Sequence, residues 1–166
     1  MGMGIRVRKA DPGEIEAVGE VTVAAYAAAE VIPEGSGYEE RLRDAQARSD
    51  GAELLVAVNG EGTVLGTVTV VHPGTVFAEI SQPGELEFRM LAVDPAQRGR
   101  GIGEVLLRAV LERGRDLGVS RVVMCSAKNM TAAHRLYERH GFTRLPSRDF
   151  SPVPGVWLQG FVRELS

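Results

Sequence analysis

The residues best suited to chemistry form a glycine-rich stretch, Gln97–Gly103, that leads into a predicted helix. Its alternating glycines, Gly99, Gly101 and Gly103, let backbone N–H groups approach a ligand closely. Those groups continue into the free N–H groups of the helix N-terminus, which carries partial positive charge. Arg98 and Arg100 place full positive charges beside them. The pattern predicts a site for a phosphate or pyrophosphate group.

Two familiar nucleotide sites fit this stretch poorly. The phosphate loop of ATPases ends in Gly-Lys-Ser/Thr, whereas Ile102-Gly103-Glu104 provides neither the lysine nor the hydroxyl. The dinucleotide fingerprint spaces its glycines as Gly-x-Gly-x-x-Gly and needs an acidic residue roughly 20 positions later. Here the glycines alternate with single residues, and the next predicted strand ends in Met124-Cys125-Ser126. Neither nucleotide-binding motif therefore accounts for the glycines of residues 97–103.

The elements around the stretch must position it. Residues 85–93 read as a strand that Asp94-Pro95 stops, and the helix after the glycines carries one apolar side. Before them, 54–58 and 63–71 read as a hairpin, because Asn59 and Gly60 tolerate positive φ.

The remaining pattern alternates between strands and helices, which predicts one mixed α/β domain over residues 1–166. A capping Asp11, Pro12 and Glu14 mark a helix start. We expect strands at 5–8, 121–126 and twice within 143–165, and helices at 11–29, 38–48 and 131–140.

Composition excludes several classes of protein. The formal net charge of -3 argues against a dedicated nucleic-acid binder, and no run approaches the roughly 20 apolar residues of a membrane span. The single cysteine, Cys125, excludes an internal disulfide and reads as a small buried hydrophobe. With no signal-peptide pattern, we expect a cytoplasmic protein. Arginine greatly outnumbers lysine, a bias associated with GC-rich bacterial genomes.

Two motifs together carry a resemblance to a known family. The segment Arg98–Gly103 resembles the Arg/Gln-x-x-Gly-x-Gly/Ala signature of the GNAT superfamily of acetyl-CoA-dependent N-acetyltransferases. The segment Ala133–Phe142 resembles that family's Leu-Tyr…Gly-Phe helix. The resemblance implies an α/β (α+β) fold with a mixed, mainly antiparallel sheet flanked by helices. It also implies direct transfer of acetyl from acetyl-CoA to a primary amine, without a metal.

The resemblance further implies roles for individual residues. The end of the signature strand, Leu91, Ala92 and Val93, would hold the acetyl group and pantetheine, and a backbone N–H near Val93 would stabilise the oxyanion. Tyr137 resembles the general acid, although packing of the helix is the alternative. Asn129 precedes the position where the family often has an asparagine, which is Met130 here, and would either contact the cofactor or cap the helix. The coenzyme A pyrophosphate would lie on the backbone of Arg98, Gly99, Arg100, Gly101, Ile102 and Gly103.

The general base is expected on the signature strand. Glu85 and Glu87 lie at alternate positions and would share one face with Arg89, Leu91 and Val93. A carboxylate there could take the amine proton directly or through water. We prefer Glu87 because it is nearer the reacting carbonyl. A solvated strand face, or a pair between Glu87 and Arg89, is the alternative.

The acceptor is a small-molecule or peptide amine that the sequence does not identify. We expect its specificity to come from loops, namely 26–37, 72–84 and 148–155. Tyr26, Phe150 and Trp157 would line its pocket or pack in the core. A non-catalytic acyl-CoA sensor and a transferase of longer acyl chains are the rival functions. An exposed sheet edge or the C-terminal strands would allow a homodimer. His72, His134 and His140 form no metal pattern.

Overall fold

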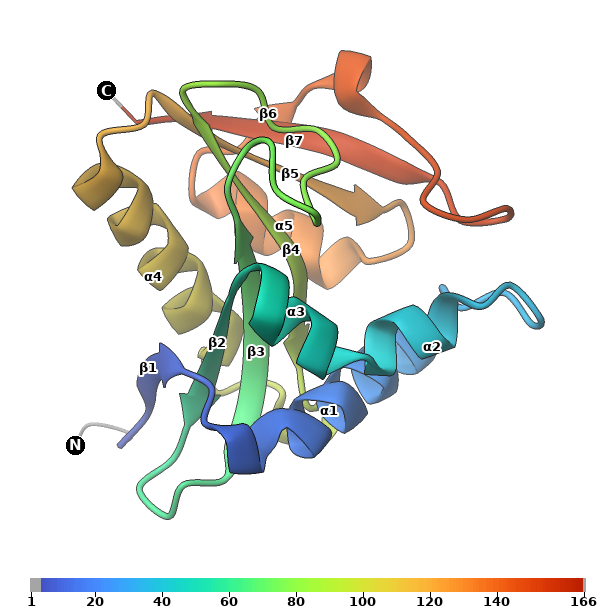
Figure 1. The fold of residues 1–166 in the computed structure, drawn as a ribbon, viewed down its shortest axis with the longest axis vertical. Coiled ribbons are helices and arrows are strands. Elements are labelled where there is room, and N and C mark those ends of the chain that lie inside the picture. Colours follow the sequence, from blue (N-terminus) through green and yellow to red (C-terminus); the bar gives the residue numbers. More distant parts are fainter. Residues whose placement is uncertain (1–3, 166) are drawn as a thin grey trace.

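A computed structural model describes residues 4–165 and contains a seven-stranded sheet with the order β1-β2-β3-β4-β5-β7-β6 (Figure 1). The pairing of β4 with β5 is parallel, and the other strand pairs are antiparallel. The expected mixed, mainly antiparallel sheet is therefore confirmed. The strands are β1 Arg6–Lys9, β2 Glu53–Val58, β3 Val64–Val71, β4 Glu85–Val93, β5 Arg121–Ala127, β6 Thr143–Arg144 and β7 Leu158–Glu164.

Helices cover both faces of this sheet and create two apolar cores (Figure 1). On one face lie α1 (Ile15–Ala28), α2 (Tyr38–Arg43) and α3 (Ala45–Gly51), whose apolar side chains meet those of β2 and β3. On the other lie α4 (Ile102–Leu117) and α5 (Thr131–Arg139). Single 3₁₀ turns occur at Pro12–Glu14, Pro95–Gln97 and Pro146–Arg148. Within residues 4–165, no helix has the length and apolar character needed to cross a membrane.

The expected helix over 38–48 is in fact two helices. Asp44 breaks it with a ψ of 69°, and its carboxylate accepts a hydrogen bond from the Ala47 N–H at 3.1 Å, capping α3. The Arg48 side chain, buried to 1% exposure, donates to the carbonyls of Arg41 and Leu42 at 2.9 and 2.8 Å. Burial lowers the pKa of this guanidinium to about 10. A buried arginine thus satisfies carbonyls that the break releases.

The hairpin between β2 and β3 forms as expected, but with a different turn. The positive φ of 82° belongs to Gly62 rather than to Asn59 or Gly60. The Asn59 side-chain oxygen accepts hydrogen bonds from the N–H groups of Glu61 and Thr63 at 2.9 and 3.0 Å. The loop is therefore longer than a two-residue turn, and the asparagine organises it through its side chain.

A bulge in β4 changes which residues share a face. Thr69 pairs with Arg89, whereas Thr67 pairs with Ala92, so Met90 and Leu91 together oppose one residue of β3. Met90 has a φ of 56°, which is uncommon for a non-glycine residue. The prediction that Leu91 and Val93 lie on the face of Glu87 and Arg89 is consequently wrong. After the bulge, Leu91 and Val93 turn towards α4, while Met90 and Ala92 join the other core.

The sheet also opens between its central strands. The parallel pairing ends where Phe88 meets Met124, and β4 then continues to Val93 while β5 continues alongside β7 (Figure 1). The backbone of residues 89–93 therefore has no strand partner on its β5 side among the described residues. This opening gives main-chain donors and acceptors that a ligand could use.

The buried arginine yields a test of the fold. Arg48→Met should lower the free energy of unfolding by about 2–4 kcal/mol, because buried carbonyls lose their donor. Urea unfolding followed by circular dichroism measures this change. Exposed Arg43, which pairs with Glu20 and Glu39, supplies the control Arg43→Met and should unfold like the parent. Equal midpoints for the two variants would contradict the role given to Arg48.

Candidate active site

A cleft of about 510 Å³ lies where the end of β4, the start of α4 and the start of α5 come together. The C-terminal end of α1 closes it with Ala25, Ala28 and Ala29. Of the residues expected to bind a cofactor, Arg100 alone does not line this cleft. Those that do are Leu91, Ala92, Val93, Arg98, Gly99, Gly101, Ile102, Gly103 and Asn129.

The glycine-rich loop has the geometry of an anion site. Gly99 and Gly101 have φ values of 82° and 74°, and a Cβ atom on either would meet no atom within 4 Å. Glycine is therefore required by backbone conformation, and the space above the loop is open. Gly101 is the N-cap of α4, and no side chain caps this end. The first N–H groups of a 16-residue helix thus point towards the cleft with partial positive charge.

Asn129 lines the cleft and makes contacts that the sequence did not predict. Its side-chain amide donates to the carbonyls of Ala29 and Glu30 at 2.7 and 3.3 Å. The N-cap position of α5 belongs to Met130, so the alternative that Asn129 caps this helix is wrong. The asparagine instead ties the loop after β5 to the end of α1, joining two walls of the cleft.

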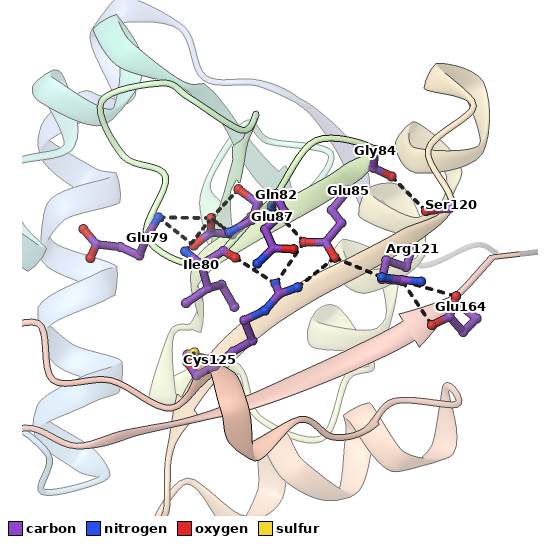
Figure 2. A network of polar contacts seen from close by, with 12 residues as sticks. Glu79, Ile80, Gln82, Gly84, Glu85, Glu87, Ser120, Arg121, Cys125 and Glu164 are labelled. Carbon is purple, nitrogen blue, oxygen red and sulfur yellow. Dashed lines mark hydrogen bonds and ion pairs between the residues drawn. The ribbon is translucent and has the colours of Figure 1, made fainter.

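Glu85 lies in a network of ion pairs (Figure 2). Its carboxylate pairs with Arg148 at 2.9 Å and Arg121 at 3.2 Å, and it accepts the Gln82 N–H at 2.8 Å. Burial acts to raise the pKa of Glu85, but the hydrogen bonds from Arg148 and Gln82 outweigh it and leave the pKa below its ordinary value. This carboxylate is fully engaged in holding the loops before β4 and β7.

Glu87, by contrast, uses mainly one of its oxygens (Figure 2). Oε1 accepts the Ser81 hydroxyl at 2.8 Å and the N–H groups of Ser81, Glu79 and Ile80 at 3.1, 3.2 and 3.4 Å. Oε2 receives only the Glu79 N–H, at 3.4 Å. The side chain is 2% exposed and lines a small cavity beside the cleft. Glu87 therefore anchors the loop before β4 and keeps one oxygen largely available.

The small cavity, of about 20 Å³, lies on the α1–α3 face of β4. Tyr26 and Phe150 line it as expected, together with Tyr38 and Arg89, whereas Trp157 is 58% exposed and lies elsewhere. The Tyr26 and Tyr38 rings pack edge to face with centroids 6.1 Å apart. Burial raises the pKa of both phenols, and the nearby Arg89 opposes that rise.

Sequence reasoning missed Arg89 as a site residue and considered it only as a partner for Glu87. Among residues 4–165, its nearest carboxylate is that of Glu79, at 3.8 Å, and its other contact is the Phe77 carbonyl at 3.3 Å. Its position two residues after Glu87, before the bulge, places both side chains in the same cavity. The alternation of charged residues in 85–89 was the available signal.

The three loops expected to select the acceptor do meet around this cavity. Arg148 donates to the Ile80 carbonyl at 2.8 Å, which joins the 3₁₀ turn Pro146–Arg148 to the loop before β4. Arg41 donates to the Pro152 carbonyl at 2.9 Å, and a Cβ atom built on Gly155 would lie 3.4 Å from the Pro33 ring. Segments distant in the chain therefore form one rim.

Tyr137 is buried to 3% exposure in an aromatic cluster rather than in the cleft. Its ring centroid lies 5.9 Å from those of Phe88 and Phe142 and 6.1 Å from that of Phe161. Burial raises the pKa of the phenol, and its hydroxyl has no hydrogen-bond partner within residues 4–165. The contacts support a packing role and leave a free donor for a ligand.

Cys125 and His134 lie close to the small cavity and make contacts of their own. Burial is the main cause that raises the pKa of Cys125 to about 12, so it stays a neutral thiol, 3.4 Å from the Arg148 carbonyl. His134 lies 3.2 Å from the Ser126 hydroxyl, and burial lowers its pKa. No group of three side chains suited to a metal ion occurs in the described part of the chain.

Known proteins resemble this chain in sequence and in fold. A mycothiol acetyltransferase from Cellulomonas flavigena is 34% identical over 145 residues, which make up 85% of this chain and 41% of that protein. A GNAT-family acetyltransferase from Staphylococcus aureus has a TM-score of 0.76 at 16% identity, covering 98% and 99% of the two chains. A phosphinothricin acetyltransferase from Sinorhizobium meliloti, solved with AcCoA, has a TM-score of 0.71 at 19% identity, covering 99% and 90%.

The curated relatives are longer than this chain, and the structural neighbours share little sequence with it. The chain spans about half the length of the curated relatives it matches. The structural likenesses, at low identity, concern the fold. The sequence model of the acetyltransferase (GNAT) family, however, matches residues 20–142, which is well over half of the chain and includes both the glycine-rich loop and α5. The chain therefore belongs to the GNAT family of acetyltransferases.

Proposed function

We propose that the protein transfers the acetyl group of acetyl-CoA to a primary amine while both substrates are bound. The observation that carries the proposal is the junction of two spaces at the opening of the sheet. The cleft at the α4 N-terminus is lined by Leu91 and Ala25, and the cavity with Glu87 is lined by their neighbours Met90 and Tyr26. A thioester in the cleft and an amine in the cavity would meet at β4.

The cleft suits coenzyme A on physical grounds. The open space over Gly99 and Gly101 and the uncapped start of α4 fit a pyrophosphate, which we assign to the backbone of residues 98–103. Arg98 lines the cleft, and exposed Arg100 adds charge to the same loop. The backbone of Leu91, Ala92 and Val93, which has no strand partner on its β5 side among the described residues, would hold the pantetheine and acetyl end. Relatives of this fold solved with acetyl-CoA support the choice.

Three groups of the chain would take part in the reaction: the Glu87 carboxylate, a backbone N–H near Val93 and the Tyr137 hydroxyl. Acetyl-CoA supplies an acetyl group activated as a thioester. Glu87 Oε2 would take a proton from the amine, whose nitrogen bonds to the acetyl carbon as the carbon–sulfur bond breaks. A backbone N–H near Val93 would stabilise the negative charge that develops on the carbonyl oxygen. Glu85 is less suited to the base role, because both its oxygens are engaged by arginines.

Tyr137 would donate a hydrogen bond to the departing sulfur. Its burial-raised pKa lies above the roughly 8.5 of an ordinary thiol, so the phenol keeps its own proton and stabilises the thiolate. The proton that the sulfur finally acquires would then come from the solvent.

The loop assignment predicts that Gly101→Asp weakens acetyl-CoA binding about 100-fold, because it places a negative charge at the helix N-terminus. Gly118→Asp is a matched control: Gly118 lies at the other end of α4 with the same φ of 74° and open space around it. Calorimetric titration with acetyl-CoA, and with NAD and ATP as comparison ligands, measures the effect. Equal losses in both variants, or tighter binding of NAD or ATP, would contradict the assignment.

The base assignment predicts that Glu87→Gln lowers kcat by about 10²- to 10⁴-fold while the Kd for acetyl-CoA stays unchanged. Glutamine keeps an oxygen for the loop N–H groups, so the fold is expected to persist. Free-thiol release in the presence of an amine gives the rate. The comparison variant Glu85→Gln should lose stability through its arginine pairs yet keep kcat in the folded protein. A loss of kcat in Glu85→Gln but not in Glu87→Gln would instead assign the base to Glu85.

The donor assignment predicts that Tyr137→Phe lowers kcat roughly tenfold, the value of one lost hydrogen bond. Its free energy of unfolding should change by less than about 1 kcal/mol, since the hydroxyl has no partner within residues 4–165. Thiol release and urea unfolding measure the two quantities. An unchanged kcat would leave Tyr137 with packing alone.

A further inference from the structure

The cavity beside the cleft contains an arginine with most of its donors unused. The Arg89 side chain is 10% exposed, and its guanidinium carries several N–H groups in a planar fork. One terminal nitrogen makes both observed contacts, a 3.3 Å hydrogen bond to the Phe77 carbonyl and a 3.8 Å approach to the Glu79 carboxylate. A nearly buried guanidinium with so few partners within the described chain is available for an anion.

A carboxylate faces the same cavity without neutralising this arginine. Glu87 precedes Arg89 by two residues on β4, so their Cα atoms are roughly 7 Å apart. Both side chains line the cavity, and no ion pair joins them among the contacts of residues 4–165. Cys125 lines the same cavity. The cavity therefore presents opposite charges side by side.

The cavity walls restrict what can reach these charges. Tyr26 and Tyr38 provide two phenols near Arg89, while Phe150 and Leu158 add apolar surface. The space between them, about 20 Å³, accommodates a small functional group rather than a whole ligand. The remainder of a bound molecule would extend to the rim formed by the loops at 30–37 and 150–157.

We propose that the acetyl acceptor is a zwitterion of the α-amino acid type, with its carboxylate or an equivalent oxyanion bound by Arg89 and its amine bound by Glu87. This inference rests on the proposed acetyl transfer and names the acceptor class. Charged side chains two residues apart on one strand match an amine and an anion on the same or an adjacent carbon atom. Polycationic acceptors such as aminoglycosides fit poorly, because Arg89 repels them. Protein N-termini lack the adjacent anion.

Matched acceptors test the proposal without any mutation. An α-amino acid, its carboxamide and its decarboxylated amine share one side chain and differ in the anion. Measured across several such sets by thiol release, kcat/KM should be at least about tenfold higher for the amino acids. Amine basicity would favour the carboxamide, which has the larger neutral fraction, so it cannot imitate this preference. Equal or higher kcat/KM for the carboxamides would overturn the proposal.

The variant Arg89→Gln assigns the preference to one residue. We expect kcat/KM to fall about 100-fold for amino acids and less than about threefold for their carboxamides, with an unchanged Kd for acetyl-CoA. Exposed Arg115, in the last turn of α4, provides Arg115→Gln, which should behave like the parent towards every acceptor. An equal loss for amino acids and carboxamides would overturn the role of Arg89.

A binding measurement separates this inference from the proposed function. Amino acids are titrated calorimetrically into the protein saturated with coenzyme A, using the parent and Arg89→Gln. Binding that Arg89→Gln abolishes would support the zwitterion site even if no acetyl transfer occurred, in which case the proposed function alone would fail. Transfer to simple amines without any amino-acid binding would support the function and overturn the zwitterion site.

Discussion

The separation of β4 from β5 beyond Phe88 is the constraint on which the rest of the site depends. Parallel strands share a ladder of hydrogen bonds only while they run side by side, and here that ladder ends at Met124. β4 continues with an unpaired edge, and the bulge at Met90 adds curvature at the same place. Backbone N–H and C=O groups that would be hydrogen-bonded in a closed sheet are thereby available to a ligand. They lie where the cleft and the small cavity are adjacent.

The two spaces that meet there differ in how they handle charge. The cleft has the N–H groups of an uncapped helix start and an exposed arginine, groups that suit a phosphate in contact with water. The small cavity uses buried side chains of both signs, Glu87 and Arg89, in a setting where each charge acts strongly because water is scarce. Under the two proposals, the end of β4 at residues 91–93 would serve a phosphate-bearing ligand, and the preceding residues Glu87 and Arg89 a compact charged one.

Side chains of β4 and of the segments around it hold the loops of the site in place. Glu87 anchors residues 79–81 mainly through one oxygen, and its side chain also lines the cavity. Glu85 binds Arg148, which in turn donates to the Ile80 carbonyl. Asn129 joins the walls of the cleft in a similar way. Substitutions in β4 are consequently expected to alter loop position and chemistry together, which is why each variant needs a matched neighbour for comparison.

The sequence alone was sufficient for most of the elements, the fold class and the cleft residues of the glycine-rich loop and the end of β4. Helical periodicity, strand alternation and the glycines of 97–103 are local signals, because they follow from φ preferences and from the repeat of each element. Other features depend on tertiary structure. No local rule predicts the bulge at Met90 or the hydrogen bond from the Asn129 side chain to the end of α1. Nor does one predict the helix break at Asp44, where buried Arg48 donates to the Leu42 carbonyl. The facing of Arg89 into a cavity with Glu87 likewise required the packing of α1 and α2 against β4, because the partners of a buried charge come from distant segments of the chain.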